Sequence, residues 1–77
     1  GVPRDEVRAF EMFQRSAQMG YDYSQASLAE CYEMGMGVER NTALAKAWYE
    51  KAAEQGEEHA LQALDRLQRQ AEKGERK

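Results

Sequence analysis

The sequence predicts an all-α solenoid of four helices, and three observations lead to this prediction. The chain repeats itself without a gap at a spacing of 36 residues, so that Gly1 lies over Gly37. A fixed spacing of roughly 20–50 residues is typical of solenoids, whose units bury their apolar faces only against neighbours. Proline occurs once, and the helix-favouring residues Ala, Glu and Gln are abundant. Apolar residues also recur at helical spacing in four segments.

The repeat is visible as identical or similar residues in the two units. Its matched pairs are Gly1/Gly37, Val2/Val38, Arg4/Arg40, Ala9/Ala45, Ala17/Ala53, Gly20/Gly56 and Leu28/Leu64, with Phe13 over Tyr49. The matches weaken toward both ends of the chain: Met12 stands over Trp48, and Asp65 and Gln68 stand over Ala29 and Tyr32. The polar pair at 65 and 68 is suited to a helix with nothing stacked beyond it.

Helix boundaries are predicted from capping residues and glycines. The expected helices cover residues about 5–19, 22–34, 41–55 and 58–72, with a polar tail at 73–77. They form one domain over 1–77, and whether this domain belongs to a longer solenoid stays open. Asp5 and Asn41 are expected N-caps, and Asp22 with Gln25 resembles a capping box. Glycines end or interrupt the helices at Gly20, Gly35, Gly37 and Gly56.

Composition excludes several classes of function. The net charge is −3 and acids are mixed with bases, which argues against a nucleic-acid surface. No apolar run reaches the roughly 18–20 residues of a membrane span, and no signal-peptide pattern is present. Cys31 is the only cysteine, so no intramolecular disulfide forms. The expected location is cytoplasmic, with the bacterial periplasm left open.

No constellation for catalysis, metal binding or cofactor binding is found. Cys31 and His59 are each alone in their type and fall on different predicted helices, whereas a thiol nucleophile needs a nearby base. A metal site needs three or four ligands, and the glycines fit neither a P-loop nor a dinucleotide fingerprint. His59 lies in the first turn of a helix, where the dipole disfavours its protonated form. The chain is therefore not expected to be an enzyme.

The strongest motif is a glycine-punctuated loop followed by an aromatic helix. It reads Gly35-x-Gly37-Val38-x-x-Asn41-x-x-x-Ala45-x-x-Trp48-Tyr49-x-Lys51-Ala52-Ala53-Glu54-Gln55-Gly56, preceded by Ser24-x-x-x-Leu28-Ala29-x-x-Tyr32. This pattern resembles the Sel-1-like repeat family, a relative of the tetratricopeptide repeats. The structural signature carried over by the resemblance is Leu28, Tyr32, Gly35, Gly37, Val38, Ala45, Trp48, Tyr49, Ala52, Ala53 and Gly56.

The resemblance implies a fold and a general role. The fold is a right-handed αα-superhelix (solenoid) of about two Sel-1-like repeats, with four antiparallel helices. The role is that of an adaptor or scaffold for other proteins, mostly in bacteria, without chemistry of its own. The aromatic residues are then core, and truncating Trp48 to Ala is expected to cost about 3–5 kcal/mol.

By analogy with tetratricopeptide repeats, the first helix of each repeat lines a concave groove. The groove residues implied by this register are Tyr23, Glu30, Glu33 and Met34 from one helix and His59, Gln62, Arg66 and Arg69 from the other. Two interpretations stay open. The acidic and basic residues form ion pairs between helices, or they line a polar groove that clamps a peptide or helix with Tyr23 as an aromatic anchor.

The expected function is non-enzymatic protein–protein interaction through this groove. An alternative is a purely architectural cap or spacer of a longer repeat protein, and a remote one is an accessory domain of an enzyme. The expected partners are proteins, with neither nucleic acid nor membrane. The chain itself is expected to be a monomer or to associate weakly end to end.

Overall fold

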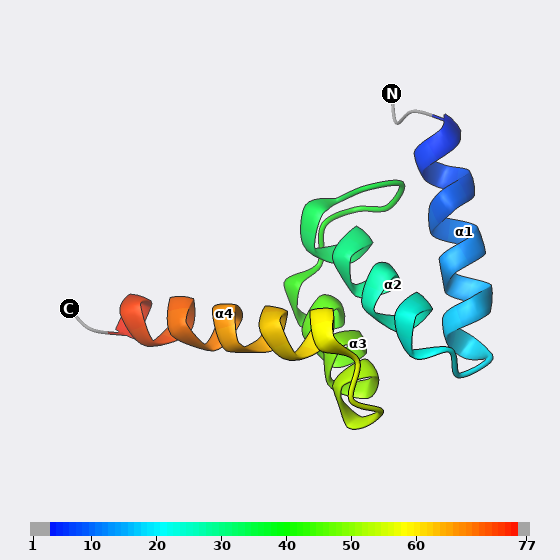
Figure 1. The fold of residues 1–77 in the computed structure, drawn as a ribbon. Helices are drawn as coiled ribbons and strands as arrows, with labels where there is room; N and C mark the ends of the chain where they lie inside the picture. Colours follow the sequence, from blue (N-terminus) through cyan, green and yellow to red (C-terminus); the bar gives the residue numbers. More distant parts are fainter. Residues whose placement is uncertain (1–3, 76–77) are drawn as a thin grey trace.

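The computed structural model describes residues 4–75, and this part of the chain contains four α-helices and no strand (Figure 1). In chain order these are α1 (Arg4–Gln18), α2 (Asp22–Met34), α3 (Thr42–Glu54) and α4 (Glu58–Glu75). The prediction of an all-α repeat solenoid is confirmed. The repeat residues Gly1 and Val2 and the last two residues of the expected tail lie outside the described residues. The tail's first three residues belong to α4, which continues three residues beyond the expected end.

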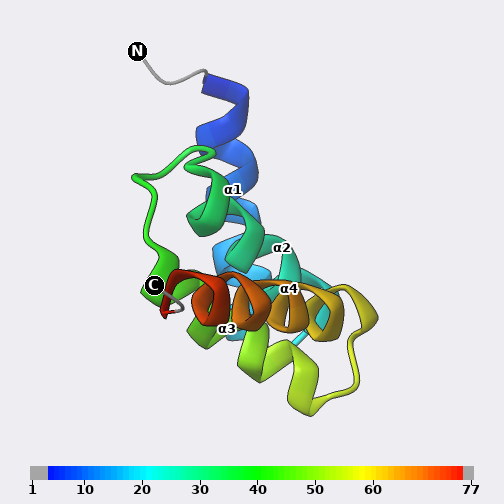
Figure 2. The same ribbon diagram turned by 90° about the vertical axis from the view of Figure 1, so that its left-hand side faces the viewer.

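Each helix packs mainly against the next one along the chain: α1 against α2, α2 against α3, and α3 against α4. Figure 2 shows α4 crossing α3, and in Figure 1 the end of α4, orange to red, extends beyond the other helices. Contacts between successive helices are what a solenoid requires, because each unit buries its apolar face on its neighbours.

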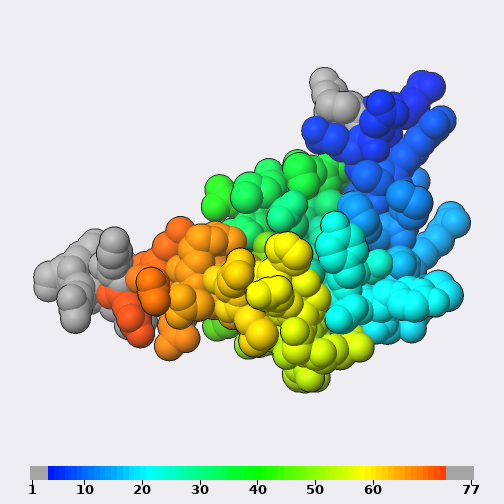
Figure 3. Space-filling view, viewed as in Figure 1, coloured from blue at the N-terminus to red at the C-terminus, as the bar shows by residue number. Residues whose placement is uncertain are grey.

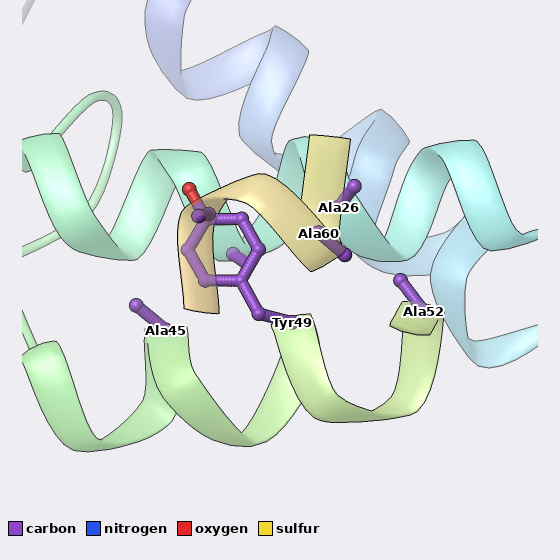
Figure 4. Close-up of a cluster of buried hydrophobic side chains, with 7 residues drawn as sticks. Ala26, Ala45, Tyr49, Ala52 and Ala60 are labelled. Atoms are coloured by element: carbon purple, nitrogen blue, oxygen red, sulfur yellow. The ribbon is translucent and has the colours of Figure 1, made fainter. Parts of the chain in front are cut away.

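The core is built from small side chains around one buried tyrosine. Tyr49 is 3% exposed and rises from α3 toward α2 and α4, between Ala45 and Ala52 on the same side of its helix (Figure 4). Leu28 is the largest fully buried side chain. Trp48 is only partly buried, with the Lys51 ammonium 5.5 Å from its ring centre. Of the two adjacent aromatic residues that were expected in the core, Tyr49 lies within it, and Trp48 packs against it from the outside.

One of the predicted helix caps is confirmed and two are wrong. The Asn41 side chain accepts a hydrogen bond from the backbone N–H of Leu44, 3.1 Å away, at the start of α3. Asp5 lies inside α1, which begins one residue earlier. Asp22 is the first residue of α2 rather than its cap, and the cap residue Tyr21 makes no side-chain hydrogen bond.

The loop between α2 and α3 folds back onto α1. Gly35 and Gly37 have φ of +74° and +72°, a left-handed conformation that favours glycine. A β-carbon at Gly37 would overlap the backbone carbonyl of Glu6 in α1. The N–H of Asn41 then donates to the carbonyl of Tyr32, 2.8 Å away, which fixes the direction in which α3 begins.

Candidate functional site

The predicted groove residues lie on α2 and α4, whose first turns are neighbours on one face of the molecule. Figure 3 shows the start of α2, in cyan, beside the start of α4, in yellow. Seven of the eight residues are exposed, and Glu33 is buried. The face therefore has an accessible surface and one acidic group beneath it.

At one end of this face an aromatic side chain meets an imidazole. Tyr23 is 62% exposed, and its ring lies edge-on to the His59 ring with 6.2 Å between their centres. His59 is held by Glu57, whose Oε2 lies 2.9 Å from the imidazole Nδ1. The other carboxylate oxygen of Glu57 accepts the N–H of Ala60 at 2.8 Å, so that one buried carboxylate caps α4 and orients the ring.

The pKa of His59 shifts in the direction opposite to the expectation. The hydrogen bond to Glu57 and the charge of that carboxylate raise the pKa of His59 above its ordinary value. The prediction that the helix dipole would disfavour the protonated form is wrong here, because a carboxylate in direct contact outweighs the partial charges of the helix end. The same hydrogen bonds lower the pKa of Glu57, against the opposing effect of its burial.

Beneath the middle of the face, Glu33 joins three helices. Its Oε1 accepts the Tyr49 hydroxyl at 2.7 Å, from α3. Arg66 of α4 donates to both carboxylate oxygens, with Nη1–Oε2 at 2.6 Å and Nη2–Oε1 at 3.1 Å. The Arg66 hydrogen bond holds the pKa of Glu33 below its usual range, and burial next to Glu33 raises the pKa of Tyr49. We call Glu33, Tyr49 and Arg66 the inter-helix triad.

The structure does not bring the remaining charged groove residues together as expected. Arg69 pairs with Asp65 of its own helix, at 3.2 Å, rather than with the acids of α2. Glu30 is exposed on α2, Gln62 is exposed on α4, and Met34 is 61% exposed near the end of α2. Of the two interpretations, inter-helix ion pairing therefore describes Glu33 and Arg66.

A hydrogen-bonded pair of glutamines was not foreseen from the sequence. The buried Gln25 amide donates to the carbonyl of Ala17 at 3.2 Å, and the Gln55 amide donates to the Gln25 oxygen at 2.9 Å and to the carbonyl of Gly20 at 3.0 Å. Gln25 thus links the end of α1 to the end of α3 instead of capping α2. Its position three residues after Asp22 suggested a capping box, and only tertiary packing distinguishes the two roles.

The described residues offer little for chemistry. Among the side chains that the structure describes, in residues 4–72, no three His, Cys, Asp or Glu are grouped to hold a metal ion. Cys31 is buried in α2, where desolvation raises the pKa of its thiol and disfavours the reactive thiolate. Among the described helices, none combines the length and hydropathy needed to span a bilayer.

Comparison with known proteins agrees with the repeat pattern. A model of the Sel1 repeat family matches residues 1–21 and 22–57. The chain belongs to the Sel1 repeat family. The matched ranges cover α1, α2 and α3, and α4 follows them as the helix that covers the last matched unit. Members of this family generally mediate protein–protein interaction, and the relatives described next are named as regulators or as binding proteins.

The relatives are much longer proteins. The chain is 39% identical over 61 residues to the chitin synthase regulator SKT5 of Saccharomyces cerevisiae, which covers 79% of this chain and 9% of that protein. It is 40% identical over 63 residues to the DAP3-binding cell death enhancer 1 of Rattus norvegicus, covering 82% of this chain and 12% of the relative. The chain thus spans about a tenth of each. Both are eukaryotic and lend no support to a bacterial origin. No solved structure matches the chain.

Proposed function

We propose that this chain is a non-enzymatic interaction module that binds a segment of a partner protein across the exposed face of α2 and α4. The observation that carries the proposal is the pairing of Tyr23 with His59. Two rings from different helices lie edge-on to each other, and both are exposed. Exposed aromatic residues on a rigid support are typical anchors of protein interfaces.

Side-chain hydrogen bonds hold together the helices beneath this face. The inter-helix triad joins α2, α3 and α4, and Glu57 fixes both the first turn of α4 and the His59 ring. A partner that binds here does not have to order the two helices first, which lowers the entropic cost of association. Glu30 and Met34 supply an acidic and an apolar contact farther along α2. A basic and apolar segment would complement them.

The relatives favour the same class of function. One is named for regulating chitin synthase and the other for binding DAP3. Because the chain spans about a tenth of each, neither activity is transferred to it. What we carry over to the proposal is the general role of a Sel1 repeat segment as a site of protein contact.

A pull-down from lysate of the source organism tests the proposal with two charge-reversal variants. Glu30→Lys alters the exposed face without touching the inter-helix triad, and Glu11→Lys places the same change on an exposed position of α1. We expect a protein retained by the wild type and by Glu11→Lys to be lost with Glu30→Lys, while circular dichroism shows all three folded. Equal retention by all three would move the contact away from this face.

An architectural role is the second candidate, and one observation favours it. The outer side of α4 carries the exposed ion pair of Asp65 and Arg69, where a further stacked helix would need small or apolar groups. Such a helix would end a solenoid without binding anything. Retention of no protein by the wild type would favour this role over the interaction module.

A further inference from the structure

A second surface feature lies apart from the α2–α4 face. A groove of about 750 Å³ runs between α3, from Thr42 to Glu50, and α4, from Leu64 to Ala71. It shares no residue with the proposed binding face. Its lining consists of Thr42, Lys46, Glu50, Leu64, Leu67, Gln68, Gln70 and Ala71.

The 36-residue repeat supplies an internal comparison for this groove. Each lining position has a counterpart 36 residues earlier, on α1, on α2 or at the C-cap of α2. Those counterparts are Glu6, Phe10, Gln14, Leu28, Cys31, Tyr32, Met34 and Gly35. The first repeat therefore shows what occupies the equivalent space when the groove is closed.

In the first repeat the space is filled in two ways. The Phe10 and Tyr32 rings pack edge to face, with 5.5 Å between their centres. The loop that follows α2 then turns back and lies on α1, with Gly37 directly against the backbone of Glu6 and the β-carbon of Phe10. An aromatic pair and a glycine-containing turn together cover the groove.

Substitutions in the second repeat leave the space open. Lys46 and Gln68 replace the two aromatic residues, and both are exposed. Ala71 replaces Gly35, whose φ of +74° ends α2. Because alanine favours the helix and disfavours a left-handed conformation, α4 continues to Glu75 instead of turning back over α3.

A second copy of the chain is a poor occupant. Stacking another unit would place a helix on the side of α4 that corresponds to the α3-facing side of α2. There Ala29 is fully buried, whereas its counterpart Asp65 is 62% exposed and pairs with Arg69. Burying that ion pair would remove both charges from water, a free-energy cost that opposes end-to-end stacking.

We propose that the groove between α3 and α4 binds a glycine-containing apolar turn of a partner protein, in the manner of the Gly35–Val38 loop on α1. The lining is apolar at Leu64, Leu67 and Ala71, and its charges are one lysine and one glutamate. These two charges cancel, so a segment without net charge complements the groove. Glycine is required where the turn approaches the backbone of α3, as Gly37 approaches that of α1.

The test uses the loop of this chain as the probe. A capped peptide with the sequence of residues 34–40 is titrated into the 15N-labelled protein, and amide shifts are followed by NMR. We expect saturable shifts at Thr42, Lys46, Leu64 and Leu67, with a dissociation constant of about 1 mM for so short a segment. The same peptide with Gly37→Ala is expected to bind at least tenfold more weakly, because its β-carbon meets the α3 backbone.

Two protein variants separate the groove from non-specific binding. Ala71→Glu adds a carboxylate beside the apolar residues of the groove and is expected to abolish the shifts, whereas Ala47→Glu makes the same change at an exposed position of α3 outside the groove. Absence of saturable shifts, equal binding of both peptides, or shifts centred on Tyr23 and His59 would each overturn the proposal. Groove shifts that grow with protein concentration and without peptide would assign the groove to a second copy.

Discussion

The inter-helix triad gives the sharpest prediction for stability. Tyr49→Phe removes the hydroxyl that donates to Glu33 and leaves the ring and the Arg66 contact in place. A hydrogen bond to a charged group contributes about 1.5–3 kcal/mol, so we expect the free energy of unfolding to fall by that amount. Against the roughly 4–12 kcal/mol expected for a domain of this size, the loss is readily measured by urea unfolding followed by circular dichroism.

A double-mutant cycle isolates the interaction itself. In Glu33→Ala the buried Tyr49 hydroxyl has lost its acceptor. Removing that hydroxyl with Tyr49→Phe in this background should therefore not lower the free energy of unfolding further. The expected coupling energy is therefore about 1.5–3 kcal/mol. Tyr21→Phe, at an exposed tyrosine, is the control and should stay within about 0.5 kcal/mol of the wild type. A coupling energy near zero, with an equal loss from Tyr49→Phe in both backgrounds, would refute the triad.

The same triad predicts a dependence on pH. The folded pKa of Glu33 lies below the ordinary value of 4.5, so its contribution is fully present above about pH 4.5 and is lost as the pH falls through the folded pKa. Wild type and Glu33→Ala should therefore converge in stability under acid. A difference that stays constant from neutral pH to pH 2 would contradict the assignment of a charged Glu33.

Three further predictions concern single positions. The pKa of His59, measured by NMR, should lie above its ordinary value of 6.5 and should fall in Glu57→Gln. The contact of protonated His59 with Glu57 stabilises the fold fully below about pH 6.5, and this contribution is lost as the pH rises through the folded pKa. Gly37→Ala should lower the free energy of unfolding, measured with urea, by about 2 kcal/mol or more beyond the loss from Gly56→Ala. Both glycines have positive φ, but only a β-carbon at Gly37 would overlap the backbone of another helix. Equal losses from the two variants would refute this close approach. Leu28→Ala, at a fully buried side chain, should cost about 2–5 kcal/mol by the same assay, and a loss below 1 kcal/mol would contradict its place in the core.

The sequence predicts the helices and their order well because these depend on local periodicity and on the 36-residue repeat. Placing Glu33 near Arg66 required only the repeat register, and the structure joins them. Asn41 was identified as a cap because its role depends on residues three positions away. Features that depend on a short stretch of chain, or on the repeat register, can thus be predicted from the sequence.

Features that depend on three-dimensional packing were missed. Trp48 and Tyr49 are adjacent, and helical periodicity cannot tell which of two neighbours enters the core and which lies partly outside. Glu57 was not predicted as the N-cap of α4. It directly precedes the helix, and its carboxylate accepts the backbone N–H of Ala60, three residues later, as an N-cap side chain does. Without this contact, the effect of the helix dipole on His59 was overestimated.

The binding face of α2 and α4 is tested most directly by photo-crosslinking. A photoreactive phenylalanine derivative replaces Tyr23, which meets His59, or Tyr21, which is similarly exposed at 58% but precedes α2. Irradiation in cells of the source organism should yield a defined protein adduct from position 23 and little or none from position 21. Adducts from position 21 alone, or equal adducts from both positions, would contradict the proposal that this face binds a partner.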